Sequence, residues 1–147
     1  MDTVKAILLD ETGRYLLQKR SATQEHPGTW DFFGGHIEAS ETPIEALQRE
    51  LLEELEYVPK SAVLFAVTPR REGGVRSFFL CTAKSSDAFA LKEGEAYAFL
   101  TREEIAELPL RDYILPAIAR VAYKFLQAKE TKLLYDSRSK DQSYQCQ

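Results

Sequence analysis

The stretch from Thr42 to Leu55 constrains the fold more than any other part of this chain. Thr42 is a favourable helix N-cap, Pro43 suits the first helical position, and Glu45 completes a capping box. Pro59 limits how far the helix can continue. Spacings of three and four residues place the apolar side chains on one stripe, which comprises Ile44, Leu47, Leu51 and Leu55. The chain must therefore cover one face of this helix with a hydrophobic core.

The same helix carries a cluster of carboxylates. Glu50, Glu53 and Glu54 stand at i, i+3 and i+4, which places their side chains within about 5 to 6 Å of one another. Like charges this close repel, whereas Mg²⁺ takes oxygen ligands and commonly holds a phosphate through one or two carboxylates. Arg49 lies one turn from Glu45 and from Glu53, so it can orient a carboxylate and offset the negative charge. Because acidic residues on a helix are more often simply solvated, the cluster alone leaves both interpretations open.

Patterns on either side of the helix predict a sheet. The expected strands cover residues 4–9, 15–20, 30–33, 61–68, 75–83 and 96–100. The first two form a hairpin around Thr12-Gly13, Gly34-Gly35 ends the short aromatic strand, and residues 61–83 form a second hairpin. A short helix follows Thr101.

A longer helix is expected from Asp112. Its buried face comprises Ile114, Ala117, Ile118, Val121, Ala122, Phe125 and Leu126. The polar segment that follows predicts one domain over residues 1–129 and a loosely ordered tail over residues 130–147.

Composition narrows the class of protein. A chain of 147 residues has room for one core, and its 44% hydrophobic and 29% charged residues are typical of a soluble globular protein. No apolar run approaches the ~20 residues that span a bilayer, and the N-terminus lacks a secretory pattern, so we expect a cytoplasmic protein. The net charge of -4 argues against binding to long nucleic acid. Cys81 and Cys146 suggest neither a disulfide framework nor a zinc site.

The residues from Gly35 to Glu54 resemble a family signature. Gly35 is followed after five residues by Glu41, and after seven more by the run Arg49-Glu50-Leu51-Leu52-Glu53-Glu54. This resembles the Nudix box, and the resemblance extends over about residues 3–128. It implies an α/β (α+β) Nudix fold, in which a mixed β-sheet is sandwiched between helices as α/β/α. It also implies a hydrolase that cleaves a phosphoanhydride bond in a nucleoside diphosphate derivative.

The resemblance also implies roles for individual residues. Glu50, Glu53 and Glu54 would hold Mg²⁺, for which Mn²⁺ is a possible substitute, and the Gly34 carbonyl would be a further ligand. Glu41 would support the loop and the helix. Glu53 or Glu50 is favoured as the general base, with Arg49 beside them. Glu93 is an outside candidate for the base, and both it and Glu95 lie where relatives carry another acidic residue.

Candidates for contact with the substrate precede the helix. Arg20 resembles the phosphate-side arginine of the family, although an exposed charge at a strand end is equally compatible with the sequence. Gly35 and Trp30 complete the candidate binding residues. Trp30, Phe32 and Phe33 could stack on a base, but aromatic residues on a short strand are more often core. His36 is more simply a loop histidine than a phosphate ligand.

The chain departs from the family pattern at three places. Glu56 stands where the family has Gly, and Tyr57 where it has a smaller aliphatic residue. A residue other than Gly in a left-handed helix end costs roughly 1 kcal/mol, so the helix either extends or ends in a strained turn. Phe33 replaces a frequent Pro. None of these positions supplies a metal ligand.

Several substrates and classes stay open. The favoured substrate is a (deoxy)nucleoside triphosphate or oxidised nucleotide, as in MutT-like members, with a nucleotide sugar as the alternative. The motifs of coenzyme A and ADP-ribose pyrophosphatases are incomplete. A non-catalytic nucleotide sensor or interaction module is a second class, although it would not need the retained carboxylates. An isopentenyl diphosphate isomerase is the least favoured, because Gly34 stands where its catalytic Cys would be. A homodimer is compatible with the family habit.

Overall fold

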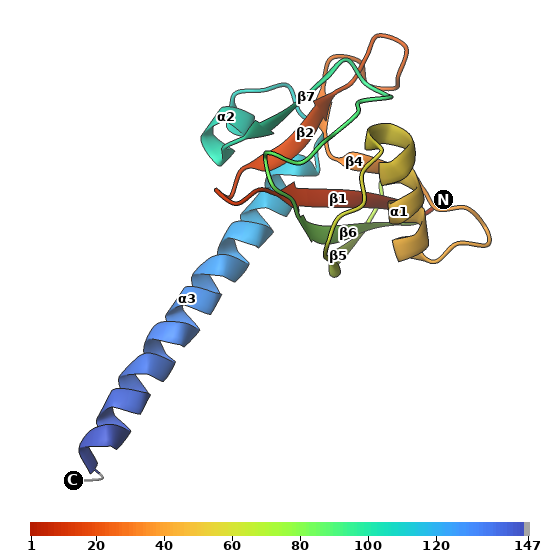
Figure 1. Cartoon of the computed structure of the whole chain (residues 1–147). Coiled ribbons are helices and arrows are strands. Elements are labelled where there is room, and N and C mark those ends of the chain that lie inside the picture. Colours follow the sequence, from red (N-terminus) through yellow and green to blue (C-terminus); the bar gives the residue numbers. More distant parts are fainter. Residues whose placement is uncertain (146–147) are drawn as a thin grey trace. The chain divides into compact units, whose positions relative to one another are not determined.

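The computed structural model describes the backbone of residues 1–145, while side chains at position 135 and from position 138 onward lie outside the description. Contacts divide the chain into two units, Met1–Arg111 and Asp112–Gln147 (Figure 1). Cys146 falls outside the described residues. None of the helices in the described part of the chain is long and apolar enough to cross a membrane.

The first unit is built on a mixed sheet of seven strands. The strands are β1 (Thr3–Leu9), β2 (Tyr15–Lys19), β3 (Trp30–Asp31), β4 (Phe33–His36), β5 (Ala62–Pro69), β6 (Val75–Thr82) and β7 (Ala96–Leu100). Their order is β3-β2-β1-β6-β5, with β4 paired to β1 and β7 paired to β2. Strands β1 and β6 are parallel, and the other pairs are antiparallel. Both expected hairpins are confirmed, as is the mixed character of the sheet.

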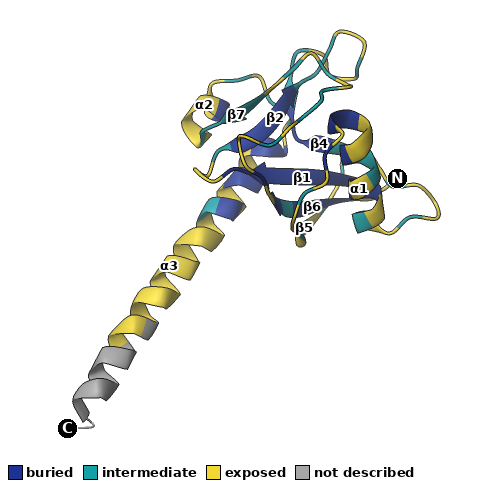
Figure 2. Ribbon diagram, viewed as in Figure 1, coloured by how far each residue is buried: buried dark blue, intermediate teal, exposed yellow. Residues whose placement is uncertain are grey.

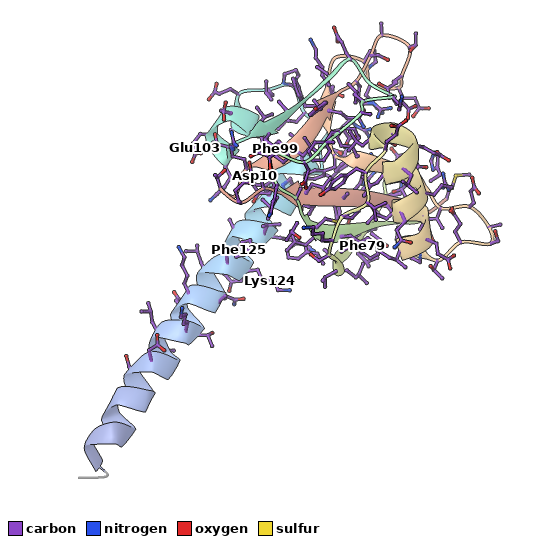
Figure 3. All side chains as sticks on the ribbon, in the orientation of Figure 1. Asp10, Phe79, Phe99, Glu103, Lys124 and Phe125 are labelled. Atoms are coloured by element: carbon purple, nitrogen blue, oxygen red, sulfur yellow. The ribbon has the colours of Figure 1, made fainter. Side chains whose placement is uncertain are left out.

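The turn between β1 and β2 is held by one carboxylate. Oδ1 of Asp10, labelled in Figure 3, accepts hydrogen bonds from the backbone amides of Thr12 and Arg14, both at 2.9 Å. These bonds satisfy donors that the short turn would otherwise leave unpaired. They also lower the pKa of Asp10 despite its burial, which on its own would raise it. Asp10 therefore closes the hairpin that brings β2 beside β1.

Helix α1 (Pro43–Leu55) begins as its sequence predicts. Thr42 is the N-cap, and both halves of the capping box with Glu45 are formed. Its apolar stripe packs on side chains from β1 and β6, including Phe79, which is labelled in Figure 3. Figure 2 shows that β1 and β6 consist largely of buried residues. The core cluster contains Val4, Ala6, Leu8, Leu16, Phe33, Ala46, Leu47, Leu51, Leu55, Tyr57, Phe79, Cys81 and Ala83. The helix is thus fixed on the sheet by burial of one face.

The prediction that Gly34-Gly35 ends the aromatic strand is wrong. Both glycines lie inside β4, where Gly34 pairs with Lys5 of β1 and Gly35 pairs with Val4. The chain changes partner after Asp31, because β3 pairs with β2 whereas β4 pairs with β1. Gly34 has φ of 148°, and a Cβ there would collide with the backbone carbonyl of Val4. Glycine permits this close approach, so it continues the strand where its turn-forming tendency suggested an end.

Helices α2 (Arg102–Ala106) and α3 (Ile114–Gln145) follow β7. On α3, Ile114, Ala117, Ile118 and Val121 are buried as predicted, but Phe125 and Leu126 are 53% and 60% exposed. The prediction of burial is therefore wrong for Phe125 and Leu126. Helical spacing identifies the apolar face of a helix but not how far along the helix other residues cover that face. The helix α3 continues through Gln145, and the sequence after Pro116 contains no Pro or Gly to end it. Loose order of residues 130–147 stays a prediction.

The end of α1 keeps a left-handed turn without glycine. Glu56 has φ of 50° and ψ of 40°, and its amide donates to the Leu52 carbonyl at 3.1 Å. The Tyr57 amide donates to the Leu51 carbonyl at 3.3 Å. Of the two outcomes expected for this departure, the helix therefore ends in a strained turn and does not extend. The strain is the ordinary cost of a Cβ in this conformation.

Replacement of Glu56 by Gly should relieve this strain. We expect Glu56→Gly to raise the free energy of unfolding by about 1 kcal/mol, measured by urea denaturation. The variant also loses the ion pair between Glu56 and Lys92, 3.2 Å apart with both side chains more than half exposed, which is worth little. Lys92→Met removes that pair alone and serves as the control. No gain in Glu56→Gly relative to this control would contradict the assignment of strain.

Candidate active site

Arg49 connects the loop before α1 to the carboxylates on it. Its Nε and Nη2 donate to the two carboxylate oxygens of Glu41 at 2.7 and 2.9 Å, and Nη2 also donates to the His36 carbonyl at 2.9 Å. Glu41 in turn accepts a hydrogen bond from the Glu38 amide at 2.9 Å. The bond from Arg49 is the main reason that the pKa of Glu41 is lowered. A bidentate arginine–carboxylate pair fixes both groups in one plane, so the loop and the helix are held together here.

The other side of Arg49 faces the helix carboxylates. Nη1 lies 3.1 Å from Glu50 and 3.4 Å from Glu53. The Glu53 side chain is 59% exposed, whereas that of Glu50 is 14% exposed. One guanidinium thus offsets the mutual repulsion of several carboxylates that the sequence places within one helical turn. In this arrangement Glu53 is directed toward Arg49.

Glu54 is the most unusual carboxyl group of the chain. It is 3% exposed, and its Oε2 atom is buried without a hydrogen-bond partner. Its pKa is raised to about 9, mainly by burial and then by the adjacent Glu50 and the charge of Glu93, while the charge of Lys5 acts in the opposite direction. A buried carboxyl oxygen without a partner is costly in a folded protein. Something other than stability therefore explains why Glu54 occupies this position.

Gly35 lies directly against the Glu50 carboxylate. A Cβ at position 35 would stand 2.5 Å from Glu50 Cδ and in collision with one carboxylate oxygen. The absence of a side chain at this position therefore lets Glu50 lie beside β4 and next to Glu54. Gly34, the other predicted backbone position, immediately precedes it in β4.

Only some of the residues predicted to bind the metal lie close together. Glu50 and Glu54 lie together, Glu53 pairs with Arg49, and among the side chains that the structure describes no three acidic, histidine or cysteine groups form a ready-made metal cluster. The residues nevertheless fit a hard divalent cation, because the donors are all oxygen and Glu54 Oε2 is buried without a hydrogen-bond partner. Binding of a cation would require Glu54 to lose its proton.

The two acidic residues predicted beyond β6 have different surroundings. The Lys92 amide donates to the Glu54 carbonyl at 2.8 Å, which places the following residue, Glu93, close enough for its charge to act on Glu54. Glu95 instead lies 3.7 Å from Lys19 of β2. Of the two, Glu93 is the one that the fold brings to the carboxylates of α1.

Sequence reasoning missed Lys5. This side chain is 10% exposed in the central strand, and its Nζ lies 3.0 Å from Oδ2 of Asp31, whose side chain is fully buried. Arg20, the predicted phosphate-side residue, lies 3.7 Å from the same oxygen. The charge of Lys5 also lowers the pKa of Glu54. The sequence did contain a signal for this residue: Lys5 interrupts the apolar run of β1, and a charge buried in such a strand needs a partner.

The aromatic residues ahead of α1 belong mainly to the core. Phe32 and Phe33 are fully buried, and the ring of Phe32 meets that of Phe78 edge to face at 6.2 Å. Neither can stack on a ligand in this structure. Trp30 is half-buried and tied through its backbone to Pro109 and Arg111. His36 is exposed and enters the Arg49 network through its carbonyl only.

The buried Glu54 should make stability depend on pH in the metal-free protein. Because its pKa rises from 4.5 to about 9 on folding, the folded state holds a proton that the unfolded state releases, and stability falls as pH rises through this window. We expect Glu54→Gln to raise the free energy of unfolding at pH 8 by on the order of 2 kcal/mol, and to change it little near pH 4. Urea denaturation with a chelator at several pH values measures this.

Glu103→Gln, on exposed α2 (Figure 3), is the matched control, and its pH profile should parallel that of the wild type. Parallel profiles for Glu54→Gln as well would show that Glu54 titrates normally.

Comparisons with known proteins identify the family of the chain. The family model of the NUDIX domain matches residues 1–121. The CTP pyrophosphohydrolase of Escherichia coli strain K12 is 29% identical over 121 residues, which cover 80% of this chain and 89% of that protein. The 8-oxo-dGDP phosphatase NUDT18 of Mus musculus is 32% identical over 99 residues, which cover 62% of this chain and only 30% of that longer protein.

A solved structure extends the similarity to the fold. The MutT protein from Methanosarcina mazei Go1 superimposes with a TM-score of 0.71 at 20% identity, covering 84% of this chain and 94% of that one. At this identity the likeness concerns the fold alone. Together with the family match over most of the chain, it confirms the fold that the resemblance implied. The chain belongs to the Nudix hydrolase superfamily and is a hydrolase that acts on phosphoanhydride bonds.

Proposed function

We propose that this chain is a Mg²⁺-dependent pyrophosphohydrolase of (deoxy)nucleoside triphosphates or oxidised nucleotides. The observation that carries the proposal is Glu54, buried with an unpartnered oxygen beside Glu50. A non-catalytic domain has no need to retain such a group at a cost in stability. The named activities of the Escherichia coli and mouse relatives, on CTP and 8-oxo-dGDP, favour a nucleotide over a nucleotide sugar. A cytoplasmic location and a homodimer stay predictions.

In this proposal Glu50, Glu53 and Glu54 hold Mg²⁺, with the Gly34 carbonyl as a further ligand and Mn²⁺ as a substitute. Bound there, the cation would neutralise phosphate charge and lower the pKa of a bound water. Arg49 keeps the carboxylates oriented through its contacts with Glu41 and Glu50. Glu53 is the favoured base. Its side chain lies beside Arg49 and is already exposed to solvent, so it can accept a proton from water. Glu50 and Glu93 are the alternatives.

The substrate lies outward from these carboxylates. Arg20 is the proposed phosphate contact, and Trp30 and Gly35 are the proposed neighbours of the nucleotide. Arg20 is 16% exposed and pairs with Asp31, so a phosphate would compete with that carboxylate for the guanidinium. Mutations can therefore distinguish the two roles. A change at Arg20 should weaken substrate binding, whereas a change at Glu53 should lower the rate of turnover.

The first experiment is a substrate panel with one matched pair of variants. The purified protein is incubated with Mg²⁺ and nucleoside triphosphates, 8-oxo-dGTP, nucleotide sugars, ADP-ribose or dinucleoside polyphosphates, and products are separated by chromatography. We expect Glu53→Gln to lower kcat by at least about 100-fold. Glu45→Gln makes the same chemical change on the same helix but preserves the capping box, so it should retain full activity. Binding of a nucleotide without cleavage by the wild type would favour the sensor.

The two glycines of β4 allow a second test of the metal site. In Gly35→Ala the new Cβ meets the mobile end of Glu50, so we expect near-normal stability and a metal affinity about tenfold lower, as measured by calorimetry with Mg²⁺ or Mn²⁺. In Gly34→Ala the Cβ meets the Val4 backbone, so the expected result is a loss of more than about 2 kcal/mol in stability. Unchanged metal affinity in Gly35→Ala would exclude Glu50 as a ligand.

A further inference from the structure

The segment between β6 and β7 brings Glu93 to α1, although it has no regular secondary structure of its own. Two of its amides bond to the end of the helix: Ala90 to the Leu55 carbonyl at 2.9 Å, and Lys92 to the Glu54 carbonyl at 2.8 Å. These carbonyls lack partners within the helix, so the segment satisfies them. The Glu95 amide then bonds to the Lys19 carbonyl at 2.8 Å. Glu93 therefore lies between attachments to α1 and to β2.

Tyr57 supplies a side-chain attachment in the middle of this segment. Its hydroxyl donates to Oδ2 of Asp87 at 2.7 Å, and its ring centroid lies 4.6 Å from that of Phe89. Asp87 also accepts from the Lys84 amide at 2.9 Å, which closes the turn before it. Tyr57 itself is 9% exposed and part of the core cluster. A rigid group anchored in the core thus holds both the turn and the aromatic residue of the segment.

At the start of the segment, the amide and hydroxyl of Ser85 donate to the Glu11 carboxylate at 2.9 and 2.5 Å. The contacts nearer to Glu93 are less specific. Phe89 also meets Phe99 at 5.7 Å and Tyr97 at 5.9 Å, which buries the ring without fixing the backbone on either side of it. The Lys92–Glu56 pair is mostly exposed and adds little. A small aliphatic residue at position 57 could neither reach the Asp87 carboxylate nor present a ring to Phe89. The direction of the segment therefore depends on the identity of residue 57.

We propose that Tyr57 is a positioning residue for the hydrolase: through Asp87 and Phe89 it holds the segment 84–95 so that Glu93 faces Glu54. This inference rests on the proposed function, and within it on the alternative in which Glu93 is the base. A displacement of about 1 Å at a reacting group can cost up to about 100-fold in rate. Tyr57 acts at a distance, because it touches the segment and not the carboxylates.

The test is a double-mutant cycle between Tyr57 and Glu93. Tyr57→Phe keeps the ring and removes the bond to Asp87, and we expect it to lower kcat about tenfold with little change in KM. On a Glu93→Gln background the same change should cost nothing further, because the residue through which Tyr57 acts is already gone. Asp87→Ala should reproduce the effect of Tyr57→Phe. Tyr97→Phe removes a hydroxyl from the same aromatic cluster and should leave kcat unchanged. Equal losses with and without Glu93 would overturn the proposal in favour of a purely structural role.

Amide hydrogen exchange gives a readout that does not depend on turnover. In Tyr57→Phe the amides of Ala90 and Lys92 should exchange faster, whereas amides in β1 should keep the wild-type rate. Unchanged exchange at both positions would overturn the attachment itself. If the wild type hydrolyses nothing, the proposed function fails and the catalytic role of Tyr57 fails with it, whereas an active wild type with full activity in Tyr57→Phe overturns this inference alone.

Discussion

The site depends on the compensation of negative charge by Arg49. Four acidic residues, Glu38, Glu41, Glu50 and Glu53, lie within 4 Å of its guanidinium. Without that cation the loop before α1 and the carboxylates on α1 would repel each other where the fold requires them to be adjacent. The bidentate bond to Glu41 takes one side of the guanidinium and leaves the other for the helix. The carboxylates can therefore be crowded for function while the helix still packs on the sheet.

Glu54 is compensated differently, because it is buried beyond the reach of Arg49. The groups that act on it are the carboxyl group of Glu50, the positive charge of Lys5 and the charge of Glu93. Lys5 is itself engaged with Asp31, so its influence on Glu54 is partial. The carboxylates at the helix surface are thus neutralised by Arg49, whereas the buried Glu54 is the group that the cation of the proposed function would compensate.

Local signals predicted local structure well. The capping box, the apolar stripe of α1 and the turns of the two hairpins depend on residues close in sequence, and each formed as expected. The contact between Tyr57 and Asp87 joins residues thirty positions apart, and that between Lys5 and Asp31 joins residues twenty-six apart. No spacing rule identifies such pairs. The prediction that Gly34 and Gly35 end a strand was wrong for a related reason. A single sequence does not distinguish a glycine that permits a turn from one that permits the close approach of another strand.

The parallel pairing of β1 with β6 has a consequence for how the chain acquires this structure. The first strand of the chain pairs with residues 76–82, so the centre of the sheet closes only after more than seventy residues have been synthesised. Until then β1 can pair only with the strands β2 and β4, and one of its edges is open. Sheets with such distant pairings fold slowly, because a long loop must close before the pairing stabilises it. During synthesis on the ribosome, the open edge of β1 is accordingly where a chaperone or a second unfinished chain would bind first.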